Sequence, residues 1–338
     1  MRSKITLKEL AKLLSVSIST VSKALNDSSE ISPKTINRVK ELAKLHNYRP
    51  NPTAVNLKRN RTGNIAVIVP NISNIFFAKV MGGIEIEARK QGFQVITYIS
   101  NESLKLEQQI TELISNGIVD GLLISVSEET QKLNDFEHLY QLLEYEIPVV
   151  LFDRINVDME VDKVGVNDMG SIYDAVQYLY SKNLRKIGLV CANGEMGLGK
   201  QRIEGYKAAC KDFNLPVNKN FLIFSQDSDT LKSKLNKLLS EEKVEALIGL
   251  DYLGTLLCSR VVQENNLRIP EDIKIIGYVN EDFAPFLWPA LSYVDQHPTL
   301  IGETAAALLV ERIKKENSNF PVKKIIKTKF VHLDSTRF

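Results

Sequence analysis

The sequence predicts two parts of different fold class. The first is an all-α N-terminal domain with a helix-turn-helix, and the second is a larger, two-lobed α/β core of parallel sheets with helices on both faces. Residues 1–45 place apolar side chains at helical spacing between capping residues, whereas from residue 65 short apolar strands alternate with helices. Residues 1–61 also hold 13 basic and 4 acidic side chains, a net charge of +9, while the remainder of the chain carries −7.

Capping residues and apolar spacing predict three helices in the N-terminal part. Thr6 and Glu9 form a capping box before an apolar face made of Leu7, Leu10, Ala11 and Leu14. Ser17 is placed to cap a second helix, and Ser32 followed by Pro33 begins a third. The second helix directs its apolar residues inward and leaves four others outward: Ile18, Ser19, Ser22 and Lys23. The brief turn between the first two helices makes this a helix-turn-helix unit.

A small helical cap that only packs against the core is the alternative interpretation. The charge argues against it, because the excess of cations coincides with the helix-turn-helix motif, as in a surface that binds nucleic acid. After the third helix, Pro50 and Pro52 extend the backbone, residues 53–58 can form a short helix, and residues 59–63 form a basic linker. We therefore expect a domain boundary near residue 62.

The core shows two successive strand–helix series, divided after residues 164–166. The expected strands are 65–69, 94–100, 120–126, 148–152, 186–191, 221–225, 246–250 and 273–278. The expected helices are 76–91, 104–116, 136–145, 171–182, 202–213, 231–240 and 255–265. Two such units predict two lobes with a cleft between them, and ligands of parallel sheets bind outside the carboxyl ends of the strands.

Composition excludes several classes of protein. The three cysteines, Cys191, Cys210 and Cys258, have no pairing pattern and suit a reducing compartment. The N-terminus lacks the apolar region of a signal peptide, and no run of about 18 apolar residues is present. The four scattered histidines lack metal-ligand spacing. We expect a cytoplasmic protein with no metal, no cofactor and no membrane association.

Residues 194–201 nearly satisfy the phosphate-binding pattern G-x-x-x-x-G-K-[ST]. The last position is Gln201, which lacks the hydroxyl that holds Mg²⁺, so nucleotide hydrolysis is disfavoured. A solute-binding protein without a role in transcription is the second alternative. The basic N-terminal helices and the missing signal peptide argue against it.

Residues 6–26 resemble the helix-turn-helix of the LacI/GalR (lactose repressor) family. The family pattern V-S-x-x-T-V-S-x-x-L-N stands here as Val16, Ser17, Thr20, Val21, Ser22, Leu25 and Asn26. The resemblance to this family covers nearly the whole chain. In the family's order, further matches are Y-x-P-N at 48–51, R-T-x-x-I-x-V-I-V-P at 61–70, N-x-F-F at 74–77, P-V-V-x-x-D-R at 148–154 and P-x-L-T-x-V-x-Q at 289–296, with Ser292 in place of Thr.

This resemblance implies a homodimeric transcriptional repressor with a periplasmic-binding-protein-like core. Its partners would be double-stranded DNA carrying a pseudo-palindromic operator, and a small effector between the lobes, a sugar or sugar acid. The implied domains are residues 1–50 for DNA binding, 51–62 for the hinge helix and linker, and 63–338 for effector binding and dimerisation. Lobe 1 would hold about 63–163 plus 295–322, and lobe 2 about 164–291 plus 323–338.

The resemblance also assigns candidate DNA contacts. Ile18, Ser19 and Lys23 take the base-reading positions, where a lysine prefers guanine less strongly than the forked arginine that is common in the family. Phosphate contacts are expected from short polar side chains, which are also potential caps: Thr6, Ser17, Thr20, Ser22 and Asn26. The hinge helix would enter the minor groove with Leu57 as an apolar wedge, flanked by Asn51, Ala54 and Lys58.

The candidate effector contacts follow the carboxyl ends of core strands. They are Ser73, Asn74, Phe76, Phe77, Asp153, Arg202, Asp251, Asn280 and Gln296. Structural alternatives are open for several: Asn74 and Asp251 as helix caps, Phe76 and Phe77 as core, and Arg202 as a surface ion pair. Val279 stands where the family often has an acidic residue, which leaves a sugar-hydroxyl contact to Asn280. An available Arg202 would then favour an anionic effector such as a uronate or a phosphorylated sugar.

Overall fold

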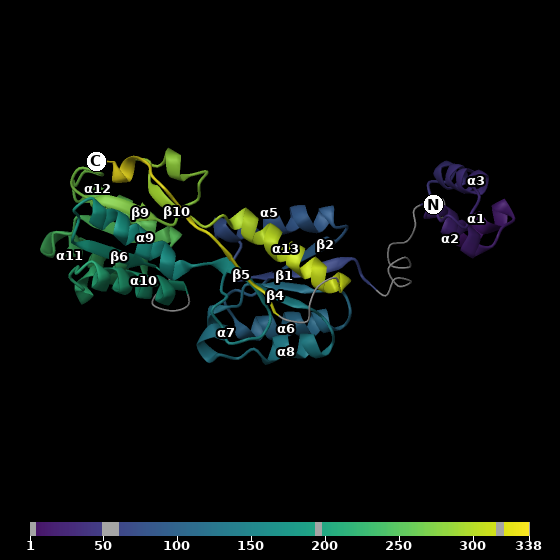
Figure 1. Cartoon of the computed structure of the whole chain (residues 1–338), viewed down its shortest axis with the longest axis horizontal. Coiled ribbons are helices and arrows are strands. Elements are labelled where there is room, and N and C mark those ends of the chain that lie inside the picture. Colours follow the sequence, from purple (N-terminus) through teal and green to yellow (C-terminus); the bar gives the residue numbers. More distant parts are fainter. Residues whose placement is uncertain (1–4, 49–60, 193–197, 316–320, 338) are drawn as a thin grey trace. The chain divides into compact units, whose positions relative to one another are not determined.

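The computed structural model describes residues 5–48, 61–192, 198–315 and 321–337 (Figure 1). The chain forms two compact units, Met1–Thr62 and Gly63–Phe338. The first unit contains the described helices α1 (Leu7–Leu14), α2 (Ile18–Leu25) and α3 (Pro33–Leu45). The second contains two lobes, each built on one sheet.

The predicted helix starts in the first unit are confirmed. Thr6 and Glu9 make both hydrogen bonds of the capping box, Ser17 caps α2, and Ser32 caps α3 with Pro33 in its first turn. Each cap satisfies a backbone N–H that has no partner within its own helix. The helices enclose a small apolar core made of Leu10, Ala11, Leu14, Val21, Ala24, Val39 and Ala43.

The described part of lobe 1 contains a six-stranded parallel sheet. From edge to edge its strands are β11 (Lys323–Ile326), β5 (Asp162–Val166), β4 (Val149–Phe152), β3 (Leu122–Ile124), β1 (Asn64–Val69) and β2 (Gln94–Ile99). Its helices are α5 (Ile75–Lys90), α6 (Leu104–Ser115), α7 (Glu128–Leu133), α8 (Glu137–Glu144) and α13 (Pro298–Lys314). The apolar core lies in two layers, one under α5 and α13 and one under α6 and α8, so both faces of the sheet are covered.

Lobe 2 repeats this plan in its described residues. From edge to edge its strands are β12 (Lys329–Val331), β10 (Ser292–Asp295), β9 (Lys274–Gly277), β8 (Ala246–Gly249), β6 (Ile187–Cys191) and β7 (Leu222–Phe224). Only the β10–β12 pair is antiparallel among them. Four helices cover the two faces: α9 (Asp168–Ser181), α10 (Leu198–Asp212), α11 (Ser228–Glu241) and α12 (Tyr252–Glu264). Short 3-10 turns η1 (Lys219–Phe221), η2 (Ala284–Phe286) and η3 (Asp334–Thr336) complete the lobe.

The chain crosses between the lobes at places that differ from the expected ones. Within the described residues it crosses after β5, after β10 and between β11 and β12, and Figure 1 shows the last crossing in yellow. β11, expected in lobe 2, belongs to lobe 1, because Lys323–Ile326 pairs in parallel with Lys163–Val166 of β5. The expected boundaries at 163/164 and 322/323 are therefore wrong, since β5 and β11 both complete the lobe 1 sheet.

Two glycines bring α5 and α13 into backbone contact in lobe 1. A Cβ added at Gly83 would lie 2.1 Å from the carbonyl oxygen of Thr299, and one at Gly302 would lie 2.0 Å from that of Val80. Only hydrogen at these positions permits such an approach. α5, which starts beside the cleft, is thereby held against α13, which follows the second crossing between the lobes.

Cys191, Cys210 and Cys258 are all buried and form no disulfide. Among the described helices, none combines the length and apolar character that crossing a membrane requires.

Candidate functional site

The outward face of α2 presents the predicted base-reading residues. Ile18 is 47% exposed, although an isoleucine normally favours burial, and Ser19 beside it is also exposed. Lys23, one turn further along α2, is 43% exposed at its side chain. The inward residues Val21 and Ala24 are fully buried, so packing of α2 fixes which side chains face outward.

The expected phosphate contacts have structural roles as well. The Ser17 hydroxyl accepts a hydrogen bond from the Thr20 N–H at 3.0 Å and lies 2.7 Å from the Ser19 hydroxyl. The Asn26 side-chain amide donates to the Ser22 carbonyl oxygen at 2.8 Å. Ser17 and Asn26 remain exposed, so capping leaves them accessible to a phosphate group. The hinge candidates Asn51, Ala54, Leu57 and Lys58 lie outside the described residues.

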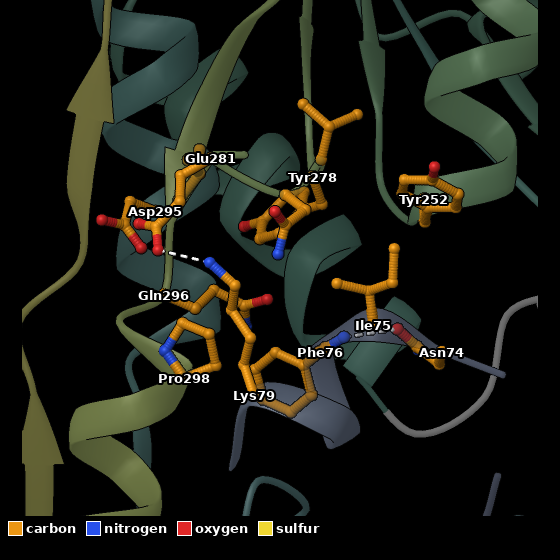
Figure 2. Close-up of a pocket in the computed structure, with 13 residues that line it drawn as sticks. Asn74, Ile75, Phe76, Lys79, Tyr252, Tyr278, Glu281, Asp295, Gln296 and Pro298 are labelled. Carbon is orange, nitrogen blue, oxygen red and sulfur yellow. Dashed lines mark hydrogen bonds and ion pairs between the residues drawn. The ribbon is translucent and has the colours of Figure 1, made fainter. Parts of the chain in front are cut away.

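A pocket lies between the two lobes, with walls from both (Figure 2). Lobe 1 supplies the N-terminal turns of α5, and lobe 2 supplies the start of α12 and the segment that follows β9. The lining residues are Asn74, Ile75, Phe76, Lys79, Tyr252, Tyr278, Val279, Asn280, Glu281, Val294, Asp295, Gln296 and Pro298. A ligand held there would contact both lobes at once.

Four predicted effector residues line this pocket: Asn74, Phe76, Asn280 and Gln296. The Nε2 atom of Gln296 is buried and has no hydrogen-bond partner among the described residues. A buried donor without a partner costs about 1–3 kcal/mol, so an acceptor oxygen of a ligand would stabilise it. Asn74 also caps α5, because its side-chain oxygen accepts from the Phe76 N–H at 3.0 Å.

The other five predicted effector residues, Ser73, Phe77, Asp153, Arg202 and Asp251, do not line the pocket. Phe77 is 3% exposed and belongs to the lobe 1 core. The carboxylate of Asp251 caps α12 through the Gly254 N–H at 2.6 Å and also accepts from the Ala192 N–H at 2.7 Å. Phe77 is thus a core residue and Asp251 a helix cap, as the structural alternatives to effector binding predicted.

Arg202 is fully engaged inside lobe 2. Its Nε lies 2.8 Å and its Nη2 2.7 Å from the same Oδ1 of Asp168, and its Nη1 donates to the carbonyl oxygen of Leu250. The guanidinium carbon lies 3.7 Å from the centre of the Tyr278 ring. Arg202 and Asp168 are 5% and 3% exposed, so this is a buried ion pair. The pair removes the available cation on which the anionic-effector hypothesis depended.

Asp153, which follows β4, is also buried. Burial raises the pKa of this carboxyl to about 7, and the neighbouring charge of Asp168 adds to the effect while Arg154 and Arg202 oppose it. The Ser125 hydroxyl lies 3.5 Å from its Oδ2. Near neutral pH a protonated Asp153 can therefore donate as well as accept hydrogen bonds.

Sequence reasoning missed the charged part of the pocket. The Lys79 ammonium on α5 reaches lobe 2, where it lies 2.5 Å from Glu281 (Figure 2). It also lies 2.8 Å from Asp282. Burial alone would lower the pKa of Lys79, but hydrogen bonds to Asp282 and Glu281 outweigh burial and raise it. Tyr278, which directly follows β9, could have been found from that position. Lys79 gave no comparable signal, because its partners lie about two hundred residues away in sequence.

The described residues contain no group of three or more His, Cys, Asp or Glu side chains that could hold a metal ion. The segment that resembles a phosphate-binding loop falls largely on residues 193–197, which lie outside the described residues. α10 begins at Leu198, so Lys200 and Gln201 are in its first turn.

Comparisons with known proteins match both parts of the chain. The family model described as "Bacterial regulatory proteins, lacI family" matches residues 6–51, and a "Periplasmic binding protein-like domain" model matches residues 176–336. The HTH-type transcriptional repressor PurR of Aliivibrio salmonicida is 33% identical over 316 residues, which cover 92% of this chain and 93% of that protein. Such relatives are named as repressors and not as enzymes.

Two solved structures are similar over almost the whole chain. The transcriptional regulator CelR in complex with cellobiose has a TM-score of 0.72 and 26% identity, and the match covers 98% of this chain and 99% of that chain. The lac repressor dimer bound to operator and the anti-inducer ONPF has a TM-score of 0.84 at 18% identity, and the match covers 99% of each chain. The second similarity shows a common fold.

Proposed function

Because this chain belongs to the LacI/GalR family of bacterial transcriptional regulators, we propose that it represses transcription by binding a pseudo-palindromic operator as a homodimer. A small molecule bound between the lobes changes its operator affinity. The observation that carries this proposal is the interlobe pocket, whose walls come from both lobes. A ligand that binds one lobe arrangement better than another shifts the population toward that arrangement and so couples the pocket to the DNA-binding unit.

The lining of the pocket supports a neutral, hydroxyl-rich effector over a sugar acid. Among the described lining residues, Lys79 is the one cation, and it already contacts Glu281, while Asp295 adds a second carboxylate. An additional anion would meet a net negative surface. Side-chain amides and aromatic rings, which bind sugar hydroxyls and sugar faces, make up much of the rest: Asn74, Asn280, Gln296, Phe76, Tyr252 and Tyr278. Cellobiose in the CelR complex is a ligand of this class.

Calorimetric titration of the full chain tests the ligand class. We expect binding of a neutral sugar from a panel that includes cellobiose, ribose, glucuronate and glucose 6-phosphate. Gln296→Leu should then weaken binding by about tenfold, because one hydrogen bond to the ligand is lost. Gln108→Leu, which changes an exposed glutamine on α6 outside the pocket, should leave the affinity unchanged. Preference for glucuronate or glucose 6-phosphate would contradict the neutral class.

The hinge supplies a test of operator binding. We propose that Leu57 wedges a base step from the minor groove, so Leu57→Ala should weaken binding to a selected operator far more than binding to mixed-sequence DNA. Gel-shift titrations with duplexes selected from random DNA by the wild-type protein measure both affinities. Leu133→Ala, at a 62% exposed leucine on α7 of the core, is the control. Equal losses on both DNAs would exclude the wedge role.

A further inference from the structure

Lys23, the one cationic residue of α2, forms an ion pair within the protein in the absence of DNA. Lys23 donates from Nζ to the carboxylate of Glu30, which stands in the connection between α2 and α3. The two side chains are 43% and 66% exposed, so water and salt screen the pair. Exposed ion pairs of this kind contribute little to the stability of a fold. We therefore consider what the pair does for DNA binding, since Lys23 lies on the base-reading face, rather than what it adds to stability.

We propose that Glu30 is a positioning and specificity-determining residue that acts through Lys23. The inference rests on the proposed function, because it assigns Lys23 to the DNA-reading face. Glu30 holds the ammonium over α2 and neutralises it, so Lys23 contributes to DNA binding only where a base offers an acceptor that replaces the carboxylate. Guanine O6 and N7 are acceptors of this kind in the major groove.

The physical reason lies in the difference between non-specific and specific binding. Non-specific affinity comes from cations that neutralise phosphates and release counterions. A lysine is a point charge on a flexible stem, and without a local partner it can swing to the nearest phosphate. Glu30 competes with phosphates for Lys23 on every DNA sequence, whereas only the operator returns a base contact in exchange. Glu30 should thus lower non-specific affinity more than operator affinity. The ratio of operator affinity to non-specific affinity, which measures specificity, is then higher.

The same unit contains a matched second ion pair. Asp27 accepts from Lys40 at 2.5 and 2.6 Å, with side-chain exposures of 65% and 44%. Lys40 stands on α3 and not on α2. Asp27→Asn therefore removes one negative charge from a similar ion pair whose lysine is on α3. It controls for the general effect of one fewer acidic residue.

The experiment compares full-length wild type, Glu30→Gln, Asp27→Asn, Lys23→Met and the double variant Lys23→Met with Glu30→Gln. The probes are poly(dA-dT), which lacks guanine, and a duplex that the wild-type protein selects from random DNA, both titrated at several KCl concentrations. For Glu30→Gln we expect about tenfold tighter binding to poly(dA-dT), with a log K against log salt slope that is steeper by about 0.9, because one more phosphate is neutralised. Its operator affinity should rise less than threefold, and its specificity ratio should fall.

The double variant isolates the role of Lys23. It should show the slope of Lys23→Met, because the Glu30→Gln change then has no lysine to release. The inference is overturned if the Glu30→Gln effect persists without Lys23, or if Asp27→Asn changes the slope and the ratio equally. If the wild type selects no sequence at all, the proposed function fails, while the slopes measured on poly(dA-dT) still decide whether Glu30 restrains Lys23.

Discussion

Replacing Arg202 with methionine should lower the free energy of unfolding of the core by about 3–5 kcal/mol, because Asp168 would remain buried without its cation. Arg202 places Nε 2.8 Å and Nη2 2.7 Å from the carboxylate and also covers the Tyr278 ring. A methionine fills similar volume but supplies neither charge nor donors. Urea denaturation of the full chain, followed by far-UV circular dichroism, measures the loss.

The loss at Arg202 should also depend on pH. Burial raises the pKa of Asp168 even beside Arg202, which opposes it, so without the guanidinium this pKa rises further. The folded variant then keeps a proton that the unfolded state, with an aspartate pKa of about 3.9, releases at lower pH. Stability of Arg202→Met relative to wild type should therefore fall as pH rises from 5 to 8. Arg185→Met is the matched control, because Arg185 lies 4.2 Å over the Tyr180 ring on the exposed surface. A similar loss in both variants would contradict the role of the buried pair.

Replacing Gly83 with alanine should destabilise lobe 1 by about 3 kcal/mol, near the upper end for overpacking. The new methyl group would lie 2.1 Å from the Thr299 carbonyl oxygen and 3.0 Å from the Glu303 N–H nitrogen. Both are backbone atoms of α13, so a side-chain rotation cannot relieve the clash. The helices must separate, which opens the apolar layer beneath them.

The adjacent glycine offers an unusually close control. Gly82 is exposed on the same helix, and a Cβ added there would have no atom within 4 Å. Gly82→Ala should stabilise the protein by about 0.5–1 kcal/mol, because alanine loses less backbone entropy in a helix. Thermal and urea unfolding of the two variants should thus change in opposite directions. Because α5 begins at the pocket, Gly83→Ala should also weaken effector binding, whereas Gly82→Ala should not.

Local chemistry explains the agreement between sequence and structure in the first unit. The caps Thr6, Ser17 and Ser32 act on backbone N–H groups within three residues, so their effect is present in the sequence itself. The same holds for the buried strands of the core, whose apolar runs appear as β1, β4 and β6. β11 lies at a sheet edge, where its residues alternate between exposed and half-buried, so it has no such apolar run. The prediction that it belongs to lobe 2 is therefore wrong, because it pairs with β5 of lobe 1.

The sequence by itself determined the fold class, the helix-turn-helix and the faces of its helices, because each depends on spacing and on neighbours a few residues away. The tertiary structure alone decided which cleft residues are available to a ligand. Asp251 ends the turn before α12, and Arg202 lies near the start of α10. Both are places where effector contacts are expected, yet Arg202 is neutralised by Asp168 and Asp251 caps a helix. Lys79 and Gln296 instead reach the pocket. Burial and charge pairing join residues far apart in sequence, and no local pattern records those partners.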